Sequence, residues 1–321
     1  MFLIPGIGSA RQFDVCPGLL PFPCPSAVRS TAAVPFGTAK IEITANCWFG
    51  CMAREPAKLR RLRSIVASLD STAVAFSGGV DSTLVARVAR DTLKKHTVAV
   101  TITSPVYPDS ELRAAKKAAN EIGIEHVVIS VDPLKDHRFV SNPPERCYLC
   151  KREDLSEIKR VAEERGLAHV VDGTNADDGK DFRPGLKAKQ ELGVRSPLAE
   201  AGIGKVDARA ISKFLGLPTA TKRSSPCLAS RIPYGESITR EKLMMIEEAE
   251  DYLVGKGFED VRVRMHGSSA RIEVDPAQIA RLGSAGTRIA VSRKLKSLGF
   301  MYVSIDMDGY RMGSLNRELK R

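Results

Sequence analysis

The sequence predicts an α/β fold: a doubly wound parallel sheet followed by a second, smaller α+β domain. Three observations support this prediction. Short β-branched segments alternate with amphipathic helical segments from residue 71 onward, this regularity loosens beyond Gly173, and 321 residues are long for one average domain. In such a sheet helices cover both faces, and ligands bind beyond the carboxyl ends of the strands. Functional residues are therefore expected in the loops that follow the strands.

The first part of the chain contains the regular alternation. Each expected strand is a short apolar run rich in β-branched residues, and the four are 72–76, 97–103, 126–131 and 168–172. Apolar residues at helical spacing predict helices at 54–69, 80–93, 109–122 and 151–165. This part is therefore expected to form the parallel sheet with its covering helices.

The last hundred residues show a different pattern. Pro, Ser and Gly are frequent in 218–238, which we expect to be a long functional loop. The elements expected after it are a helix at 239–256, strands at 260–265, 270–274 and 302–306, and helical stretches at 276–282 and 287–298. We place a domain boundary near residue 236, which gives domains at 52–236 and 237–321.

Residues 1–51 differ from the rest. They hold five charged residues, six prolines and four of the seven cysteines, and no helical or strand period persists in them. The first ten residues lack the basic residue that opens a secretory signal. A basic helical pattern follows Met52, so we expect the functional chain to start there, with 1–51 as an irregular extension that need not belong to the native protein. Cys47 and Cys51 could form a metal or redox pair, but no further ligands of suitable spacing lie beside them.

The composition is that of a globular protein. Hydrophobic residues make up 43% of the chain, which excludes disorder along the whole length. No apolar run reaches the roughly 18 residues that a membrane-spanning helix requires. The net charge of +11 suits phosphate-bearing ligands or a solvated basic surface equally well. Free cysteines and the missing export signal favour a cytoplasmic location.

The strongest local signal is the segment Ser77-Gly78-Gly79-Val80-Asp81-Ser82, between an expected strand and an expected helix. Two glycines allow a tight turn that directs backbone N–H groups inward, and the helix N-terminus adds its positive dipole. Ser77 and Ser82 can donate hydrogen bonds to phosphate oxygens. Asp81 is unusual beside an anion, and a Mg²⁺ ion that bridges its carboxylate and a pyrophosphate would explain it. A glycine turn before a well-capped helix explains the glycines but not Asp81.

This loop resembles that of the PP-loop ATP pyrophosphatases, a superfamily that includes GMP, NAD and asparagine synthetases and enzymes that thiolate tRNA or cofactors. The segment 172–178 (DGTNADD) is similar to their second signature. The resemblance implies that ATP is cleaved between its α and β phosphates, which adenylates a substrate oxygen. It also implies that Gly173 and Asn175 join residues 77–82 in binding ATP, and that Asp177 or Asp178 joins Asp81 in holding Mg²⁺.

Three cysteines in the body of the chain indicate a metal or sulfur site. Cys147 and Cys150 form a CxxC pair just before an expected helix, and Cys227 lies in the long loop. Three thiolates could hold three irons of a [4Fe–4S] cluster and leave the fourth iron open for a hydrosulfide. They could also bind zinc together with one water. A nearby arginine, Arg223 or Arg231, would favour the nucleophilic thiolate of Cys227.

Together these motifs resemble the LarE family of ATP-dependent sulfur transferases, which help to build the nickel-pincer nucleotide cofactor. The resemblance runs from residue 52 to about residue 310, and its most specific segments are 77–82, 142–151, 172–178 and 224–235. It implies that ATP adenylates a carboxylate of pyridinium-3,5-biscarboxylic acid mononucleotide, and that a sulfur nucleophile then displaces AMP to leave a thiocarboxylate. In members with one cysteine, at the position of Cys227, that residue gives up its own sulfur. Because this chain also has Cys147 and Cys150, the resemblance favours a [4Fe–4S] cluster held by all three.

Several residues beyond the first domain are candidates for binding the substrate. Arg262 and Arg264 alternate on one strand face and could clamp a phosphate, although an exposed basic strand face is an equal alternative. By family analogy Glu250 and Glu273 could contact a metal or the substrate ring. Tyr148 could stack on a ring or pack between the two cysteines.

Two other functions remain open at this point. A PP-loop tRNA thiolation enzyme shares the phosphate loop and would suit the basic charge, but no separate RNA-binding module is evident. A non-catalytic nucleotide- or metal-binding module would not release pyrophosphate from ATP. The expected partners are a small-molecule nucleotide and sulfide or another sulfur donor, with no nucleic acid and no membrane. The second domain is expected to mediate formation of a homo-oligomer.

Overall fold

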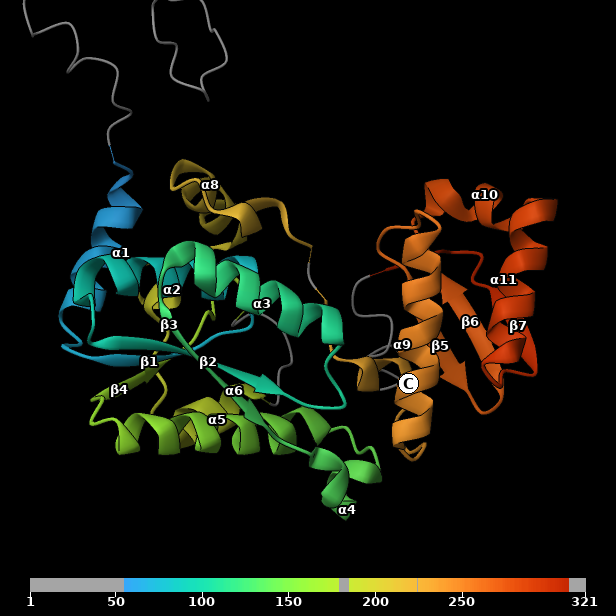
Figure 1. Ribbon diagram of the computed structural model, residues 1–321, viewed down its shortest axis with the longest axis horizontal. Coiled ribbons are helices and arrows are strands. Elements are labelled where there is room, and N and C mark those ends of the chain that lie inside the picture. The colour runs from blue at the N-terminus through green and yellow to red at the C-terminus, as the bar shows by residue number, and fades with distance from the viewer. Residues whose placement is uncertain (1–54, 179–184, 224, 312–321) are drawn as a thin grey trace, which may run out of the picture. The chain divides into compact units, whose positions relative to one another are not determined.

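The computed structural model describes residues 55–178, 185–223 and 225–311. Its central sheet consists of β1 (Thr72–Ala75), β2 (Thr97–Thr103), β3 (Glu125–Ser130) and β4 (His169–Val171). All four strands are parallel, in the order β3-β2-β1-β4 (Figure 1). The predicted parallel sheet is confirmed. Because β2 and β4 lie on opposite sides of β1, the loops after β1 and β4 border the crevice where such sheets bind ligands.

Helices cover both faces of this sheet, as predicted. They are α1 (Ala57–Ala67), α2 (Val80–Leu93), α3 (Asp109–Ile122), α4 (His137–Val140), α5 (Arg146–Glu164), α6 (Gly185–Leu192), α7 (Pro197–Glu200) and α8 (Lys205–Phe214). One apolar cluster joins α1, α2, α3 and α8 to β1 and β2, and another joins α5 to β1 and β2. Figure 1 shows α2 and α3 on one side of the sheet and α5 on the other. Each large apolar side chain buried in these clusters contributes about 1.5–3 kcal/mol, which holds the strands between the two helix layers.

A second, smaller sheet follows. It contains β5 (Arg262–His266), β6 (Ser269–Glu273) and β7 (Tyr302–Ile305), with β5 antiparallel and β7 parallel to β6. Beside it are α9 (Arg240–Gly255), α10 (Ile279–Gly283) and α11 (Ala285–Ser297). This confirms a second sheet, as the sequence predicts, while the domain boundary near residue 236 stays a prediction.

The long loop 218–238 is partly built into the core of this second sheet. Leu228 and Ile232 are fully buried there, together with Val106 and Phe139 from the first part of the chain. The loop contains two short 3-10 helices, Pro218–Thr221 and Leu228–Arg231. Residues 228–232 are therefore held in place, which matters because Cys227 directly precedes them.

The start of α5 differs from the prediction. The helix begins at Arg146 rather than 151, so Cys147 and Cys150 lie in its first turn instead of before it. Pro143 and Pro144 precede this turn. Proline has no backbone N–H, and this costs no helical hydrogen bond here, because the first N–H groups of a helix have no partner within the helix. Cys and Tyr are weak helix formers, and their presence hid this turn from the sequence pattern.

Four of the described helices, α4, α6, α7 and α8, were missed altogether. For α8 a signal was present, because Asp207 stands three residues after the N-cap Gly204 and accepts its N–H at 3.2 Å. The predictions for residues 1–51, including the pair Cys47 and Cys51, lie outside the described residues.

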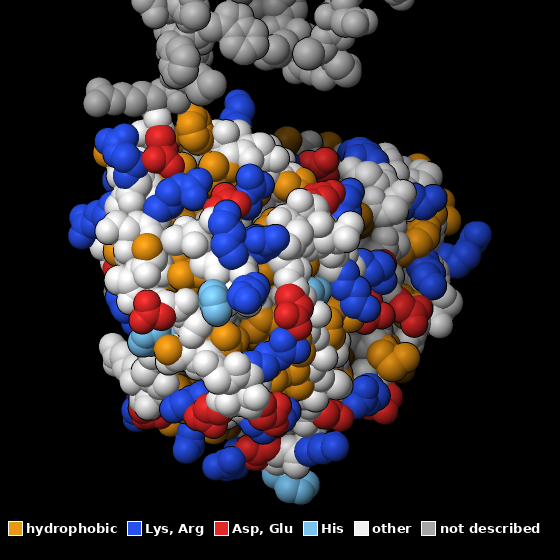
Figure 2. Space-filling view, turned by 60° about the vertical axis from the view of Figure 1, so that its left-hand side comes forward, with side chains coloured by type: hydrophobic (Ala, Val, Ile, Leu, Met, Phe, Trp, Pro, Cys, Tyr) orange, Lys and Arg blue, Asp and Glu red, His pale blue; other side chains and the backbone are white. Residues whose placement is uncertain are grey.

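The surface is mixed in charge on the face drawn in Figure 2. Lys and Arg side chains there are spread among Asp and Glu and do not gather in one patch. In the described parts of the chain, no helix is both long enough and apolar enough to cross a membrane.

Candidate functional site

The loop between β1 and α2 has the geometry of an anion cradle. Gly78 has a φ of +65°, and a Cβ at this position would lie 2.6 Å from the Cα of Ala115 in α3, so only glycine fits. Gly79 is the N-cap of α2, whose first N–H groups have no helical partner. The Oγ atoms of Ser77 and Ser82 are 3.1 Å apart across the loop. The residues predicted to bind ATP, from Ser77 through Val80 to Ser82, therefore surround the N-terminus of α2.

The loop after β4 closes one side of this cradle. Gly173 presses on α2, where a Cβ would lie 2.6 Å from the backbone nitrogen of Ser82. Asn175 is buried, and its Nδ2 donates to the Oδ2 of Asp81 at 3.1 Å. The structure thus brings together two predicted sites that are 94 residues apart in the chain.

Asp81 is a candidate for holding a cation. Burial raises its pKa above the usual value, the amide of Asn175 opposes that rise, and the nearby carboxylate of Asp178 adds to it. Two carboxylates that repel each other in this way form a place where a divalent cation would be stabilised.

The two aspartates predicted as partners of Asp81 have different surroundings. The Oδ2 of Asp177 accepts the N–H of Lys205 at 2.8 Å and so stabilises the start of α8. Asp178 is buried and acts electrostatically on Asp81. Asp178 is also engaged, since its Oδ2 accepts the N–H of Asn175 at 3.1 Å and its Oδ1 lies 3.9 Å from the Nζ of Lys205. Of the two, Asp178 is the carboxylate whose charge acts on Asp81.

A buried polar network, which the sequence analysis did not single out, holds the second loop in place. The Oδ1 of Asp172 accepts the hydroxyl of Ser196 at 2.7 Å, and its Oδ2 lies 3.2 Å from the Nζ of Lys189. Thr174 donates to the same carboxylate at 2.7 Å. Both charged side chains are almost fully buried, so this pair fixes the chain just before Asn175.

The three predicted cysteines lie close to one another. Cys147 and Cys150 are in the first turn of α5, and Cys227 is the N-cap of the second 3-10 helix. All three are free thiols. Loss of solvent around the sulfur raises the pKa of Cys147 and of Cys150, and the nearby Cys227 contributes to both increases. The thiols are therefore near enough for their charges to act on one another.

A partly buried tyrosine and a buried carboxylate, also missed in the sequence, lie beside these thiols. The hydroxyl of Tyr107 donates to the Oδ2 of Asp154 at 2.6 Å and lies 3.6 Å from the Sγ of Cys150. Burial raises the pKa of Tyr107 well above its usual value and also raises that of Asp154. Asp154 follows Cys150 by four residues and so shares its helix face. This spacing could have indicated that the carboxylate lies beside Cys150.

Arg231 anchors the backbone of Cys227. This side chain is 1% exposed, and its Nη1 donates to the carbonyl of Cys227 at 3.0 Å. Its Nε and Nη2 bind the two carboxylate oxygens of Glu250 at 2.9 and 2.8 Å. Arg223, the other candidate, pairs instead with Asp260. Of the two arginines, Arg231 is the one that contacts the cysteine residue.

Two further arginines lie on β5. Arg262 and Arg264 are each only 7% exposed, so the alternative of an exposed basic strand face is wrong. Arg264 binds both carboxylate oxygens of Glu273 at 3.1 and 3.0 Å. The guanidinium of Arg262 stacks on the ring of Tyr310 at 4.8 Å, and burial followed by the charge of Arg231 lowers its pKa. Arg231 and Arg264 are each neutralised by a buried glutamate, and Arg231 is the one that contacts Cys227.

Tyr148 is used differently from either expectation. Its hydroxyl donates to Glu191 at 2.7 Å, and the Nζ of Lys187 lies 5.5 Å from its ring centroid. Both partners belong to α6, so this tyrosine joins α5 to α6.

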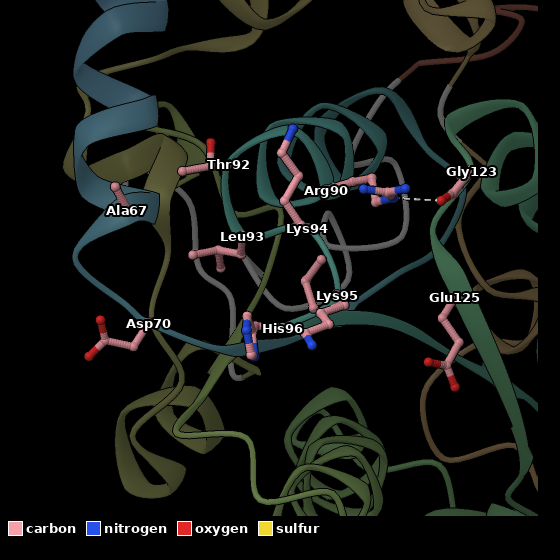
Figure 3. A pocket seen from close by; sticks show the side chains of 11 residues that line it. Ala67, Asp70, Arg90, Thr92, Leu93, Lys94, Lys95, His96, Gly123 and Glu125 are labelled. Carbon is pink, nitrogen blue, oxygen red and sulfur yellow. Dashed lines mark hydrogen bonds between the residues drawn. The ribbon is translucent and has the colours of Figure 1, made fainter.

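Among the residues that the structure describes, no group of three or more His, Cys, Asp or Glu side chains is arranged to hold a single metal ion. A pocket of about 750 Å³ lies elsewhere, at the amino ends of β2 and β3. Arg90, Lys95, His96 and Glu125 are among the residues that line it (Figure 3). Ligands of parallel sheets bind at the opposite, carboxyl ends of the strands, so this pocket is separate from the candidate site.

Comparisons with known proteins agree with this geometry. The asparagine synthase family matches residues 62–139, which include the phosphate loop. The pyridinium-3,5-bisthiocarboxylic acid mononucleotide synthase of Lactiplantibacillus plantarum is 39% identical over 271 residues, which cover 84% of this chain and 98% of that protein. The chain belongs to the LarE family.

Two uncharacterized proteins are also similar to this chain. One, from Synechocystis sp., is 44% identical over 264 residues, covering 82% of this chain and 98% of its own. The other, from Methanocaldococcus jannaschii, is 32% identical over 238 residues, covering 74% and 90%. The family and the enzyme class predicted from the sequence, an ATP-dependent sulfur transferase of the PP-loop type, are confirmed. Neither alternative function is supported by these relatives.

Proposed function

We propose that this protein adenylates a carboxylate of pyridinium-3,5-biscarboxylic acid mononucleotide with ATP and converts it to a thiocarboxylate. The proposal rests on the presence of two parts in one chain. One is a phosphate cradle at the carboxyl end of β1, and the other is a loop that presents Cys227 beside buried arginines. The activity named for the relative from Lactiplantibacillus plantarum agrees with both parts.

The first stage uses the phosphate loop. The N–H groups at the start of α2 and the hydroxyls of Ser77 and Ser82 would bind the polyphosphate of ATP. Asp81 and Asp178 would hold Mg²⁺, since their mutual repulsion is relieved by a cation. When bound, that ion neutralises phosphate charge as pyrophosphate leaves. The substrate carboxylate oxygen attacks the α phosphate, and the residues contribute positioning and electrostatic stabilisation.

The nucleotide substrate would be bound by the arginines of β5. Arg262 and Arg264 both extend from one strand, and burial, followed by the charge of Arg231, lowers the pKa of Arg262. This crowding of positive charge would be relieved by a substrate phosphate. Glu250 and Glu273 are the counterions that keep Arg231 and Arg264 in position in the absence of substrate.

Cys147, Cys150 and Cys227 would hold a [4Fe–4S] cluster. Their thiols are free and act on one another's charge, and thiolates are the usual ligands of such clusters. When bound, the cluster would supply an open iron that can carry a hydrosulfide.

The experiment that tests this function supplies Mg-ATP, sulfide and pyridinium-3,5-biscarboxylic acid mononucleotide to the full chain. Pyrophosphate release and the mass of the product are measured together. We expect pyrophosphate release that depends on the mononucleotide and a product in which sulfur replaces one carboxylate oxygen. Absence of both, with protein that binds ATP, would overturn the proposal.

The sulfur source is tested with Cys227→Ser. Thiocarboxylate formation should fall by at least about 100-fold because a group needed for sulfur delivery is lost, while pyrophosphate release persists. Protein purified without oxygen should contain about four iron and four sulfide per chain. If neither is present and Cys227 has lost its sulfur after turnover, the residue itself is the donor and the cluster is excluded.

The protein is also proposed to act in the cytoplasm as a homo-oligomer. Free thiols support the location. The exposed side chains of Met301, Tyr302 and Met307, at and near β7, support self-association through the second sheet. Light scattering of the purified chain and of Tyr302→Lys tests this, and an unchanged mass would contradict it.

A further inference from the structure

The first turn of α5, which carries two of the three thiols, also contains a buried arginine. Arg146 is 2% exposed. Its Nη1 donates to the Oδ1 of Asn142 and, at 2.9 Å, to the carbonyl of Ala229. The ring centroid of Tyr234 lies 5.4 Å from the guanidinium carbon. This one side chain therefore contacts both the segment that leads into α5 and the loop that follows Cys227.

Asn142 extends the contact further along that loop. It is fully buried, and its Nδ2 donates to the carbonyl of Pro233 at 2.6 Å and to that of Glu236 at 3.0 Å. Its own carbonyl accepts the N–H of Gly235 at 3.0 Å. Its φ is +56°, a left-handed conformation that asparagine adopts more readily than most residues. Asn142 and Arg146 together form a polar clamp between the start of α5 and residues 229–236.

The clamp adjoins two of the thiols along the chain. Cys147 directly follows Arg146, and Cys227 is two residues before Ala229. The N–H of Ser230 donates to the carbonyl of Cys227 at 3.0 Å, so one short turn joins the clamped carbonyl to the cysteine. All of these residues are described, and the clamp therefore connects the CxxC turn to Cys227 by an unbroken series of contacts.

The other anchors of the loop hold it to different parts of the molecule. The N–H of Leu228 donates to the carbonyl of Val106, and Arg231 pairs with Glu250 of α9. Neither partner belongs to α5. These anchors fix the loop against the core of the second sheet, whereas the clamp fixes it against the helix that carries the other two thiols.

The charge of Arg146 suits this position. Among the described residues its partners are an amide, a carbonyl, an aromatic ring and the thiol of Cys147, with no carboxylate. Arg231 and Arg264, by contrast, are each paired with a glutamate. A buried charge without an opposite charge is costly, and cysteine binds metals as the anionic thiolate. Arg146 therefore supplies positive charge where the sulfur atoms of the site would carry negative charge.

We propose that Arg146 is a positioning residue that holds Cys147 and Cys150 at a fixed separation from Cys227. The inference rests on the proposed function in one respect, namely that the three thiols act together in sulfur transfer. Because the clamp exists before any ligand binds, the ligand does not have to order the two segments itself. Loss of the clamp should therefore lower thiocarboxylate formation and leave ATP-dependent pyrophosphate release in place.

The experiment uses dibromobimane, which joins two nearby thiols as each thiolate displaces one bromide. The full chain is first freed of metal with a chelator, and the masses of the linked peptides identify each pair. One product joins Cys147 to Cys150 within the helix, and the other joins either of them to Cys227. The ratio of the second product to the first measures the separation across the clamp, because the first product depends only on the turn of α5.

Arg146→Met should lower this ratio about fivefold, which is the scale of one lost hydrogen bond. Arg160→Met is the matched control, since it removes an exposed arginine of the same helix that pairs with Glu157 and Glu164, and it should keep the wild-type ratio. Arg146→Lys keeps a charged donor and should restore part of the ratio. Asn142→Asp removes the donors to the loop carbonyls at nearly constant size and should lower the ratio as well.

The outcomes separate this inference from the proposed function. An unchanged ratio in Arg146→Met that is folded by circular dichroism overturns the inference, and if that variant does not fold, Asn142→Asp decides in the same way. A wild type that forms no product with Cys227 also overturns it. If the ratios follow the expectation but the wild type makes no thiocarboxylate, the proposed function is overturned and the positioning role of Arg146 is retained.

Discussion

The phosphate loop and the site around Cys227 are built in different ways. The first is contiguous: Ser77 to Ser82 form one turn between β1 and α2, and local geometry decides what each residue does. The second is assembled from separate segments, with Cys150 on α5, Arg231 on the long loop and Glu250 on α9. A contiguous turn depends on backbone shape, whereas the assembled site depends on buried charge pairs.

Because of this difference, the two sites are sensitive to different kinds of substitution. In the phosphate loop the critical property is space, since Gly78 has no room for a side chain against Ala115. Around Cys227 the critical property is charge balance, since the guanidinium of Arg231 is 1% exposed and depends on Glu250. Substitutions of the two kinds should therefore fail in different measurements.

The largest effect is expected from Gly78→Ala. The new methyl group would meet the backbone of Ala115 at 2.6 Å, so the loop must shift and misplace its N–H groups. A misplacement of this size costs on the order of 100-fold in rate, and ATP-dependent pyrophosphate release should fall accordingly. Gly123→Ala is the matched control, because that glycine also has a positive φ, +71°, but nothing within 4 Å of a new Cβ. Equal pyrophosphate release in the two variants would contradict the steric argument.

The second effect is a loss of stability in Glu250→Ala. Removal of this carboxylate leaves the charge of Arg231 buried without its partner, which costs about 3–5 kcal/mol in the free energy of unfolding. Guanidinium denaturation measures it. Glu248→Ala removes a neighbouring glutamate of α9 that is 55% exposed and pairs with Lys294 at 3.8 Å, and it should cost less than about 1 kcal/mol. Similar costs for both variants would mean that water reaches Arg231.

The smallest effect concerns His126, which lies beneath the phosphate loop. Its ring packs edge-on against Phe76 with centroids 5.7 Å apart, and its Nε2 lies 2.8 Å from the Oγ1 of Thr101. Burial, followed by the charge of Lys116, lowers its pKa from the usual value. The unfolded chain therefore binds a proton more readily than the folded one, so the free energy of unfolding decreases as the pH falls through the unfolded pKa toward the lower folded pKa.

The measurement is the free energy of unfolding between about pH 7 and pH 5, across the ordinary pKa of histidine. His126→Gln should flatten the decrease, and His137→Gln, in α4, gives the background change expected from removing a histidine elsewhere. An unchanged slope in His126→Gln would show that the sheet beneath the loop does not depend on the neutral imidazole.

The contiguous site and the central sheet could be predicted from the sequence because their signals are local. The bounds of α2, β2 and α3 agree with the predicted ranges, since apolar spacing and flanking Gly or Pro residues mark them. The partners of the assembled site could not be predicted in the same way. Nothing in the sequence near Cys150 indicates that Tyr107 lies 3.6 Å away, because that contact depends on packing between segments 43 residues apart.

The arginines show the same limit. Arg262 and Arg264 have the alternation of a half-exposed strand, yet both are buried, because α9 and the long loop cover β5. Glu250 and Glu273 were suspected by analogy, but their pairing with Arg231 and Arg264 required the fold. Asp177 and Asp178 are adjacent in sequence, and only the position of α8 distinguishes their tasks.

The spacing of Cys147 and Cys150 on α5 decides whether their side chains share one face of the helix. With 3.6 residues per turn, Cys147 and Cys150 are about 60° apart around the helix axis, so both thiols lie on one face. One residue inserted between them would leave about 40° of separation, whereas one residue deleted would leave about 160°. A chain with the deletion would still contain both cysteines, but their side chains would no longer share one face of the helix.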